Sequence, residues 1–301
     1  AWGYSRGGMG SITKAMANSL KSRSGEIKAG SPVSKILIKN NKSYGLILEN
    51  GDEIYANKIV SNLDVKRTFL KVVEEKELPT DFYNAVKNFK IRGSSGKLNI
   101  ALDDLPVWKS IPVGDPAGTG DLHITQSIEE MEGAYDDWKQ GKWSQFPYVD
   151  MCIPSINDPT MAPQGKHYMS VFIQYVPYNL ADGGWTEEKR QEFGKHVMGR
   201  IGNYSNNFNN IIKHAEIRTP KELESEVGLT EGNIFQGELT MDQLMFNRPI
   251  PGYAQYKTPI KNLYMCGSST HPGGGVMGAP GANAAREILK DINKKVDSHY
   301  L

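Results

Sequence analysis

The sequence predicts a two-domain protein that combines an α/β domain with an α+β domain. Its 301 residues exceed the length of about 250–300 residues at which a single hydrophobic core usually stops growing. Near the C-terminus a strand at 262–266, a long loop at 267–280 and an apolar-striped helix follow one another, the order found in α/β folds. From about Asp81 to about Met245, strands and helices mix without that order, which is typical of an α+β domain.

The first 75 residues predict one helix and a small antiparallel meander. Ser11 is suited to cap a helix that ends at Gly25, because Ile12, Ala15 and Leu20 recur at helical spacing. Runs rich in Ile, Leu and Val, separated by Asn-rich and Gly-rich turns, then predict strands. The predicted strands are 33–39, 44–49, 53–56 and 58–61, and a short helix follows over 64–69.

The middle of the chain predicts fewer regular elements. Strands are expected at 97–102 and 167–176, and loops at 103–120 and 179–184. Helices are expected at 127–138, 186–204 and 220–227.

Composition excludes several classes of function. The net charge of +1, from 35 basic and 34 acidic residues, argues against nucleic acid as a partner. No run of about 18 apolar residues is present, so we expect no transmembrane segment. Two cysteines support neither a disulfide framework nor a four-cysteine zinc site, and the six histidines lack ligand spacing, so we expect no metal site. The low cysteine count favours a cytoplasmic protein, either free or peripheral to a membrane.

Glycines cluster in the loop before the last helix. Residues 273–278 match G-x-G-x-x-G, but the loop is long and the chain ends at Leu301 without the second strand and acidic residue of a dinucleotide fingerprint. Bare backbone over a helix N-terminus lets a flat ligand approach, and free N–H groups at Gly278, Gly281 and Ala282 would favour an anion. The alternative is a glycine-rich loop that only packs tightly.

The residues Leu263–Val276, which read LYMCGSSTHPGGGV, together with Gly278 and Gly281, resemble the C-terminal flavin segment of the phytoene-desaturase-like family of FAD-dependent oxidoreductases. That family also holds carotenoid isomerases and amine-oxidase-like relatives. The Gly-Gly-Met-Gly turn at 7–10, the strands over 25–62 and the approach at 243–259 resemble further family segments. The resemblance is strong at both ends of the chain and weak in the middle.

The resemblance implies an architecture. The point at which this sequence departs from the family pattern implies that a segment is missing. Residues 1–75 and 246–301 would form the remainder of an FAD-binding domain of the two-dinucleotide-binding type, and residues 76–245 an inserted mixed-sheet substrate domain. The family's N-terminal βαβ unit, whose G-x-G-x-x-G turn grips the pyrophosphate, is not found in this sequence. We therefore expect the C-terminal portion of a larger flavoprotein, whose partner is the N-terminal FAD-binding segment of the same protein, and weak or absent FAD binding by this chain alone.

The resemblance also implies site residues. Gly8 and Met9 would lie near the flavin and Val33 would meet the adenine through its backbone, while the C-terminal loop would wrap the cofactor. The loop residues concerned are Gly267, Gly274, Gly275, Val276, Gly278, Gly281 and Ala282. His271 is the candidate catalytic residue because histidine titrates near neutral pH, although a hydrogen bond that fixes the loop is an equal alternative.

The implied function is an oxidoreductase, either a dehydrogenase or an oxidase, that takes hydride from a small, largely apolar substrate. Two alternatives stay open: an isomerase that uses flavin without net redox change, and a non-catalytic binding module that has lost its nucleotide-binding half. Cofactor binding separates the last from the other two.

Overall fold

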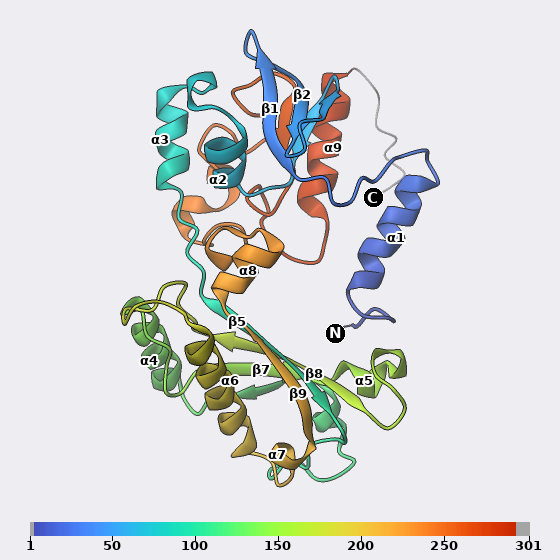
Figure 1. Cartoon of the computed structure of the whole chain (residues 1–301), viewed down its shortest axis with the longest axis vertical. Helices are drawn as coiled ribbons and strands as arrows, with labels where there is room; N and C mark the ends of the chain where they lie inside the picture. The colour runs from blue at the N-terminus through green and yellow to red at the C-terminus, as the bar shows by residue number, and fades with distance from the viewer. Residues whose placement is uncertain (1–2, 293–301) are drawn as a thin grey trace. The chain divides into compact units, whose positions relative to one another are not determined.

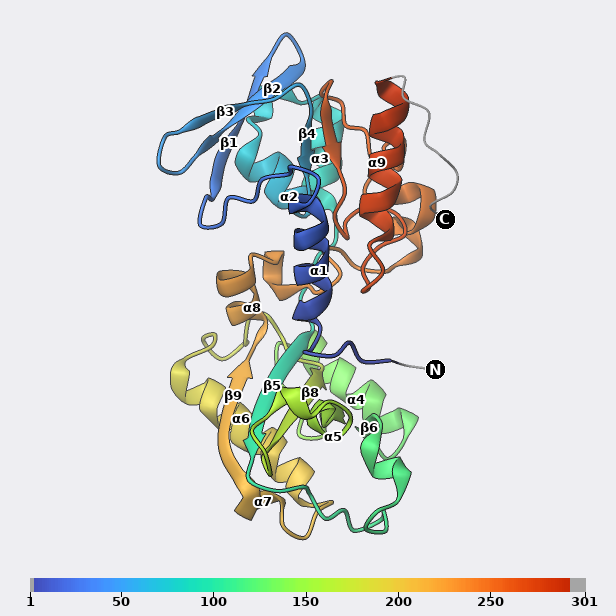
Figure 2. The same cartoon turned by 90° about the vertical axis from the view of Figure 1, so that its right-hand side faces the viewer.

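The computed structural model describes residues 3–292, so the outermost parts of the expected domain ranges, residues 1–2 and 293–301, lie outside the description. The chain forms two compact units, each built from two separate stretches of sequence. Unit 1 combines Ala1–Ile27 with Gly93–Val227, and unit 2 combines Lys28–Arg92 with Gly228–Leu301. The elements of both units can be followed in Figures 1 and 2.

Unit 1 is built on a five-stranded sheet in the order β6-β7-β8-β5-β9, in which all neighbours pair antiparallel. Its strands are β5 (Ser95–Leu102), β6 (Leu122–Ile124), β7 (Tyr148–Cys152), β8 (His167–Gln174) and β9 (Ile212–Arg218). Its helices are α1 (Gly10–Lys21), α4 (Ile128–Lys139), α5 (Pro154–Asn157), α6 (Glu187–Gly202), α7 (Phe208–Ile211) and α8 (Pro220–Val227).

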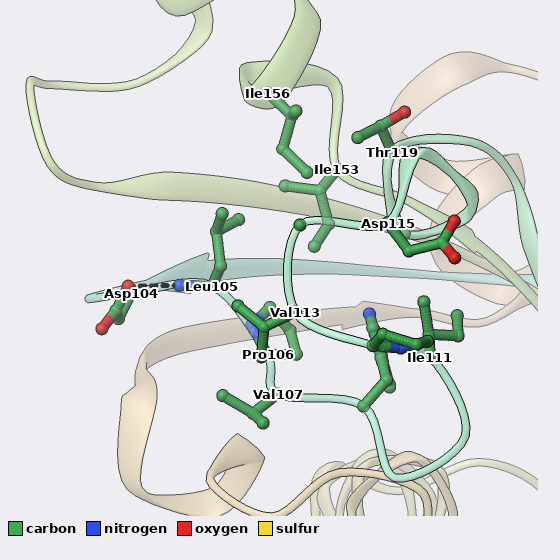
Figure 3. Close-up of a pocket in the computed structure, with 14 residues that line it drawn as sticks. Asp104, Leu105, Pro106, Val107, Ile111, Val113, Asp115, Thr119, Ile153 and Ile156 are labelled. Carbon is green, nitrogen blue, oxygen red and sulfur yellow. Dashed lines mark hydrogen bonds between the residues drawn. The ribbon is translucent and has the colours of Figure 1, made fainter.

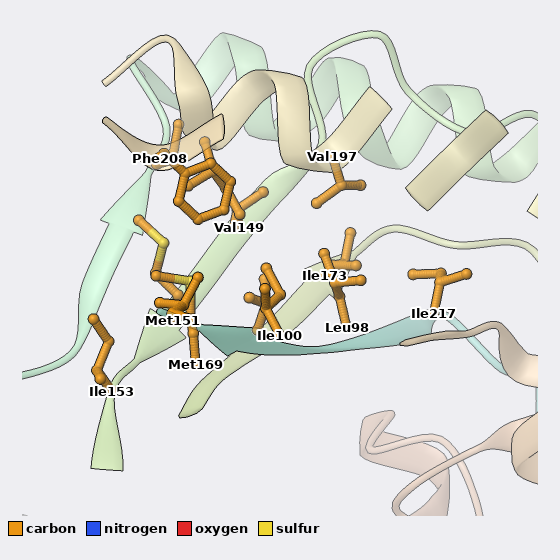
Figure 4. Close-up of a cluster of buried hydrophobic side chains, with 14 of the residues drawn as sticks. Leu98, Ile100, Val149, Met151, Ile153, Met169, Ile173, Val197, Phe208 and Ile217 are labelled. Atoms are coloured by element: carbon orange, nitrogen blue, oxygen red, sulfur yellow. The ribbon is translucent and has the colours of Figure 1, made fainter. Parts of the chain in front are cut away.

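One face of this sheet carries the core of unit 1. Alternate residues of β5, namely Leu98, Ile100 and Leu102, are at most 1 % exposed, as the period of two of a strand requires. They join Val197 of α6 and Phe208 of α7 in one apolar cluster, which Figure 4 shows between the strands and these helices. The residues between them on β5 therefore project from the opposite face.

Unit 2 contains a three-stranded antiparallel sheet, β1-β2-β3, and a parallel pair, β4 with β10. Its strands are β1 (Val33–Lys39), β2 (Lys42–Leu48), β3 (Glu53–Tyr55), β4 (Ile59–Ser61) and β10 (Leu263–Met265). Its helices are α2 (Val65–Arg67), α3 (Thr80–Asn88) and α9 (Ala279–Asp291). The core joins both stretches of sequence, since Ile36 and Phe69 share one cluster with Ile260 and Leu263.

The units do not follow the expected boundaries. Residues 76–92 and 228–245 pack in unit 2 rather than with the mixed sheet, because Phe82, Val86 and Phe89 belong to the core of unit 2. Residues 1–27 group with unit 1, where Gly7 N–H donates to the Asp158 carboxylate.

The meander of β1 to β3, the return strand β4, and helices α1, α4, α6, α8 and α9 lie where the sequence predicts them, to within a few residues. Strands β6, β7 and β9 and helix α3 are additions to the prediction. Within residues 3–292, no helix has the length and apolar character needed to cross a membrane, and no group of three or more His, Cys, Asp or Glu side chains has the geometry to hold a metal ion.

Candidate functional site

The first half of the glycine-rich loop in unit 2 is a buried, hydrogen-bonded turn. Ser269 and Thr270 are fully buried. The Ser269 hydroxyl donates to the Gln236 carbonyl at 2.5 Å and accepts from Val65 N–H at 3.1 Å, while the Thr270 hydroxyl and N–H both donate to the Gly267 carbonyl. These bonds fix the loop to the segment that follows β4 and leave it little freedom to move.

Arg248 stabilises this turn through hydrogen bonds from its buried guanidinium. Its side chain is fully buried, and its guanidinium donates to the carbonyls of five residues. These are Phe235, Gly237, Glu238, Gln243 and Ser268, at 2.8–3.4 Å. Burial lowers the pKa of Arg248 to about 10, which still leaves the group charged at neutral pH. A cation held by neutral carbonyls alone commits this part of the backbone to one conformation.

The second half of the loop is open. Val276 and Met277 are 74 % and 59 % exposed. Gly278 caps α9 in the left-handed region with a φ of 64°, and a Cβ on Gly278 or on Gly281 would meet nothing within 4 Å. Among residues 3–292 the N–H groups of Gly278 and Gly281 have no recorded acceptor. This backbone is therefore free to meet a ligand.

Three predicted site residues make structural contacts within unit 2. A Cβ on Gly267 would lie 2.5 Å from the Asn62 carbonyl oxygen, and one on Gly274 would lie 3.0 Å from the Phe235 ring, so tight packing explains both glycines. The prediction of a free N–H at Ala282 is wrong, because this group donates to the Gly278 carbonyl at 3.0 Å. This Ala282 bond is the first hydrogen bond of α9 between residues four positions apart.

Gly275 and His271 remain candidates. Gly275 has a φ of 139°, and the atom nearest to a Cβ there is the flexible end of Met277, 2.7 Å away. Among residues 3–292 the side chain of His271 makes no hydrogen bond that fixes the loop, and its buried Nδ1 has no partner there. The backbone does this instead, since the His271 carbonyl accepts from the Tyr256 hydroxyl at 2.8 Å. Buried nitrogens of His196 and Arg200 also lack a partner in the described part of the chain, so this feature keeps His271 a candidate but does not by itself indicate a ligand.

Val33 begins β1 and lines a cavity of about 630 Å³ within unit 2. Ile36, Leu46 and Val60 supply apolar walls, while Arg67 and other charged groups lie on its rim. The expected contact of Val33 with a ligand is therefore possible without any rearrangement of the strand.

Gly8 and Met9 lie in unit 1 rather than in unit 2 with the other candidates. A Cβ on Gly8 would lie 3.1 Å from the sulfur of Met161, and Met9 is about half exposed. The turn is held by Asp158, whose carboxylate accepts from Gly7 N–H at 2.5 Å and from the Thr160 hydroxyl at 2.6 Å. These hydrogen bonds, chiefly the one from the Thr160 side chain, hold the pKa of Asp158 below its ordinary value.

The turn at 7–10 should therefore loosen when Asp158 loses its charge. A lowered pKa in the folded protein means that the stabilisation is present above the unfolded pKa of about 3.9 and is lost as the pH falls through the folded value. We expect Asp158→Asn to speed hydrogen exchange at residues 5–12 at pH 6, and the native chain to do so only below about pH 4. Asp104→Asn is the matched control. Unchanged exchange at residues 5–12 in Asp158→Asn would contradict this role.

The polar face of the unit 1 sheet is a feature that the sequence analysis missed. Lys97 projects from β5 and bonds Ser170 on β8, and no carboxylate among residues 3–292 lies within ion-pair distance of it. Burial lowers the pKa of Lys97 and raises the pKa of Asp150 on β7. Nearby, the Tyr168 hydroxyl donates to Asn99 at 2.8 Å. Alternation along β5 was the available signal, because Lys97 and Asn99 interrupt an otherwise apolar strand.

Unit 1 also contains an apolar pocket of about 350 Å³ beside the end of β5. Leu105, Val107 and Val113 from the loop after β5, and Ile153 and Ile156 from the α5 region, line it (Figure 3). Val113 is 87 % exposed. The pocket therefore presents apolar surface to solvent, which suits an apolar ligand.

Comparisons with known proteins agree with this fold. Residues 2–204 match the family model described as flavin containing amine oxidoreductase. The rat "Pyridine nucleotide-disulfide oxidoreductase domain-containing protein 2" is 37 % identical over 300 residues, which cover 97 % of this chain and 52 % of the rat protein. The chloroplastic prolycopene isomerase of Daucus carota is 27 % identical over 315 residues, covering 99 % and 46 %. The chain spans about half the length of these curated relatives.

A solved oxidoreductase from Methanosarcina mazei has the same mixed α/β fold over 95 % of this chain and 55 % of its own, with a TM-score of 0.59 at 20 % identity. The family model covers more than half of the chain, and the glycine-rich loop before α9 has the residues that we compared with the flavin segment of phytoene-desaturase-like enzymes. The chain thus belongs to the flavin-containing amine oxidoreductase family, whose members are FAD-dependent oxidoreductases and isomerases.

Proposed function

We propose that this chain forms part of an FAD-dependent oxidoreductase, a dehydrogenase or an oxidase, that takes hydride from a largely apolar organic substrate. The observation that carries the proposal is the backbone between β10 and α9. Hydrogen bonds from the Arg248 guanidinium fix the start of this backbone, and there is open space beside Gly278 and Gly281. A preformed, side-chain-free surface at a helix N-terminus suits a flat cofactor that carries negative charge.

The residues present fit such a cofactor. Gly275, Val276 and Gly278 would lie against it, and the free N–H groups of Gly278 and Gly281 would donate to its acceptors. When bound, the flavin would supply the acceptor for the hydride that the substrate loses. His271 would exchange a proton with the bound molecules through its unpartnered Nδ1, and this makes it the residue that we propose as catalytic.

The adenosine part of the cofactor would lie at the cavity that Val33 lines. In the described part of the chain, β4 pairs only with β10, and Val60 of β4 is 45 % exposed. A parallel strand next to β4 would extend the pair into the kind of sheet that carries dinucleotide-binding turns. We therefore propose that a βαβ segment with a G-x-G-x-x-G turn, from the N-terminal part of the same protein, completes the cofactor site.

The substrate proposal rests on unit 1. Its apolar pocket of about 350 Å³ suits a hydrocarbon or the apolar portion of a larger molecule. Hydride transfer to a flavin depends mainly on holding a C–H bond in the right orientation, so an apolar pocket that fixes the substrate contributes directly to the rate.

The chain alone should hold FAD weakly. We expect it to purify with well under one FAD per chain, because no residue described here grips the pyrophosphate. The same chain within the longest reading frame that includes it should purify with one FAD. Absorbance at 450 nm after desalting measures both. A stoichiometric yellow complex with the chain alone would contradict the proposed division of the cofactor site, and a colourless longer protein would contradict the proposed cofactor.

An isomerase is the second candidate, because the carrot relative is named as one. The two activities differ in electron balance. An oxidoreductase consumes one equivalent of electron acceptor for each substrate converted, whereas an isomerase consumes none. A binding module that has lost its nucleotide-binding half would catalyse neither reaction and would not retain flavin.

A further inference from the structure

A basic pocket in unit 2 lies apart from the glycine-rich loop. It has a volume of about 340 Å³ and is lined by Lys58, Lys257 and Lys261 with Asn262, Tyr264 and Asp291. Lys58 precedes β4, and Lys261 and Asn262 precede β10, so the pocket lies at the amino ends of these two parallel strands. The glycine-rich loop follows the carboxyl end of β10. The pocket is therefore separate from the proposed flavin surface.

Positive charge in this pocket exceeds negative charge. Asp291 is the one carboxylate among the lining residues. It accepts from Lys257 Nζ and from the Tyr264 hydroxyl, both at 2.7 Å. Lys58 Nζ donates to neutral groups, the Asn262 amide oxygen at 2.9 Å and the Tyr264 hydroxyl at 3.3 Å. Within residues 3–292 the ammonium of Lys261 has neither an ion pair nor a hydrogen bond.

Backbone pairing adds further lysines to this edge. Lys42 faces Lys261 in a parallel bridge and faces Lys39 across the hairpin of β1 and β2. The arrangement is fixed, because Ser43 N–H donates to the Lys261 carbonyl at 2.9 Å and Lys261 N–H donates to the Asn41 carbonyl at 3.0 Å. Like charges at facing positions of neighbouring strands destabilise a sheet. Of these lysines Lys261 lines the pocket, so an anion bound there would offset part of the repulsion that it experiences.

We propose that this pocket binds a phosphate-bearing ligand. Lysine ammonium groups bind phosphate as point charges. Lys261 and Lys58 are available without the loss of any ion pair, and Lys257 would share its charge between Asp291 and the ligand. The Asn262 amide supplies a neutral donor, whereas the single proton of the Tyr264 hydroxyl is donated to Asp291. Burial and the bond to Asp291 raise the pKa of Tyr264 to about 12, so the phenol stays protonated at neutral pH. The volume admits more than one phosphate group.

Inorganic pyrophosphate is the probe for a soluble ligand. We expect calorimetric titration of the full chain at low salt to detect binding, and Lys257→Gln with Lys261→Gln to weaken it at least tenfold and to flatten its salt dependence. The matched control is Lys166→Gln with Lys213→Gln, two exposed lysines of unit 1 that both pair with Asp103. This control should bind as the native chain does. Circular dichroism checks that each variant is folded.

Vesicles distinguish a lipid headgroup from a free phosphate. If the ligand is a lipid, the chain should sediment with vesicles that contain phosphatidylglycerol and not with pure phosphatidylcholine, and the double variant should stay in solution. If it is a free phosphate, pyrophosphate should bind while both kinds of vesicle leave the chain in solution. Binding of neither probe, or binding that the double variant leaves unchanged, would overturn the proposal. The flavin is absent from all of these measurements, so the outcome does not depend on the proposed oxidoreductase.

Discussion

Replacing Arg248 by methionine is expected to destabilise unit 2 by about 3–5 kcal/mol. The substitution keeps much of the apolar stem but removes the guanidinium donor from five carbonyl oxygens, of which that of Glu238 keeps the Gln243 side-chain amide as a second donor. Each buried acceptor that loses its partner costs about 1–3 kcal/mol, and partial relaxation of the backbone sets the total below their sum. The stability of Arg248→Lys should lie between that of the native chain and that of Arg248→Met, because an ammonium cannot present the planar fork of a guanidinium.

The measurement must report on unit 2 alone. The four tryptophans among residues 3–292 lie in unit 1, so their fluorescence would report on unit 1 and not on unit 2. Hydrogen exchange read by mass spectrometry is suitable, and Arg248→Met should speed exchange in peptides from 235–270 and leave those from 95–102 unchanged. Arg286→Met is the matched control, because within residues 3–292 that guanidinium makes one hydrogen bond, to Asn283. A loss below about 0.5 kcal/mol, the usual range for a surface change, would mean that the carbonyls find other donors.

The sequence predicted much of unit 2 because its signals are local. The β1 to β3 meander has Asn-rich turns, and both Asn40 and Asn41 adopt positive φ angles at the first of them. Alternation then fixes which residues of each strand are buried. The strand, loop and helix at the C-terminus were predicted for the same reason.

The rest depends on contacts between distant residues. Strand β6 has three residues and β7 has five, too short for periodicity to be distinguished from chance. The N-terminal segment is tied to unit 1 by long-range bonds, from Gly7 to Asp158, 151 residues apart in the sequence, and from Tyr4 to Asp121. Arg248 lies in the segment 243–259, and nothing in the neighbouring residues predicts that its guanidinium is fully buried.

Some features of the candidate site are likewise predictable from local sequence, and others depend on contacts between distant residues. The sequence identified the glycines of the loop, but it could not separate those required by packing from those that leave backbone open. A Cβ on Gly267 would meet the backbone after β4, whereas one on Gly278 would meet nothing. This difference depends on the Asn62 carbonyl, which lies 205 positions earlier in the chain, and so it gives the sharpest test of the proposed cofactor surface.

Gly267→Ala is expected to destabilise unit 2 by about 1–3 kcal/mol, the usual cost of overpacking. The added methyl would lie 2.5 Å from the Asn62 oxygen, and main chain on both sides gives way less easily than a side chain. Urea unfolding followed by circular dichroism measures the loss, and hydrogen exchange at 59–65 locates it. FAD retention should fall only as far as unfolding explains.

Gly278→Asn is expected to leave the stability of unit 2 almost unchanged and to reduce FAD retention. Asparagine tolerates the left-handed conformation that Gly278 adopts, so stability should change by less than about 0.5 kcal/mol. Its side chain would extend into the open space where we propose that the cofactor lies, so FAD retention in the longest reading frame should fall at least tenfold. Gly252→Asn is the control, since Gly252 also has a positive φ, of 86°, and open space but lies outside the glycine-rich loop. If Gly278→Asn kept its FAD while folding normally, the open backbone would have no role in cofactor binding. If it unfolded instead, Gly278 would serve the turn and not the ligand, because the conformation itself is one that asparagine accepts.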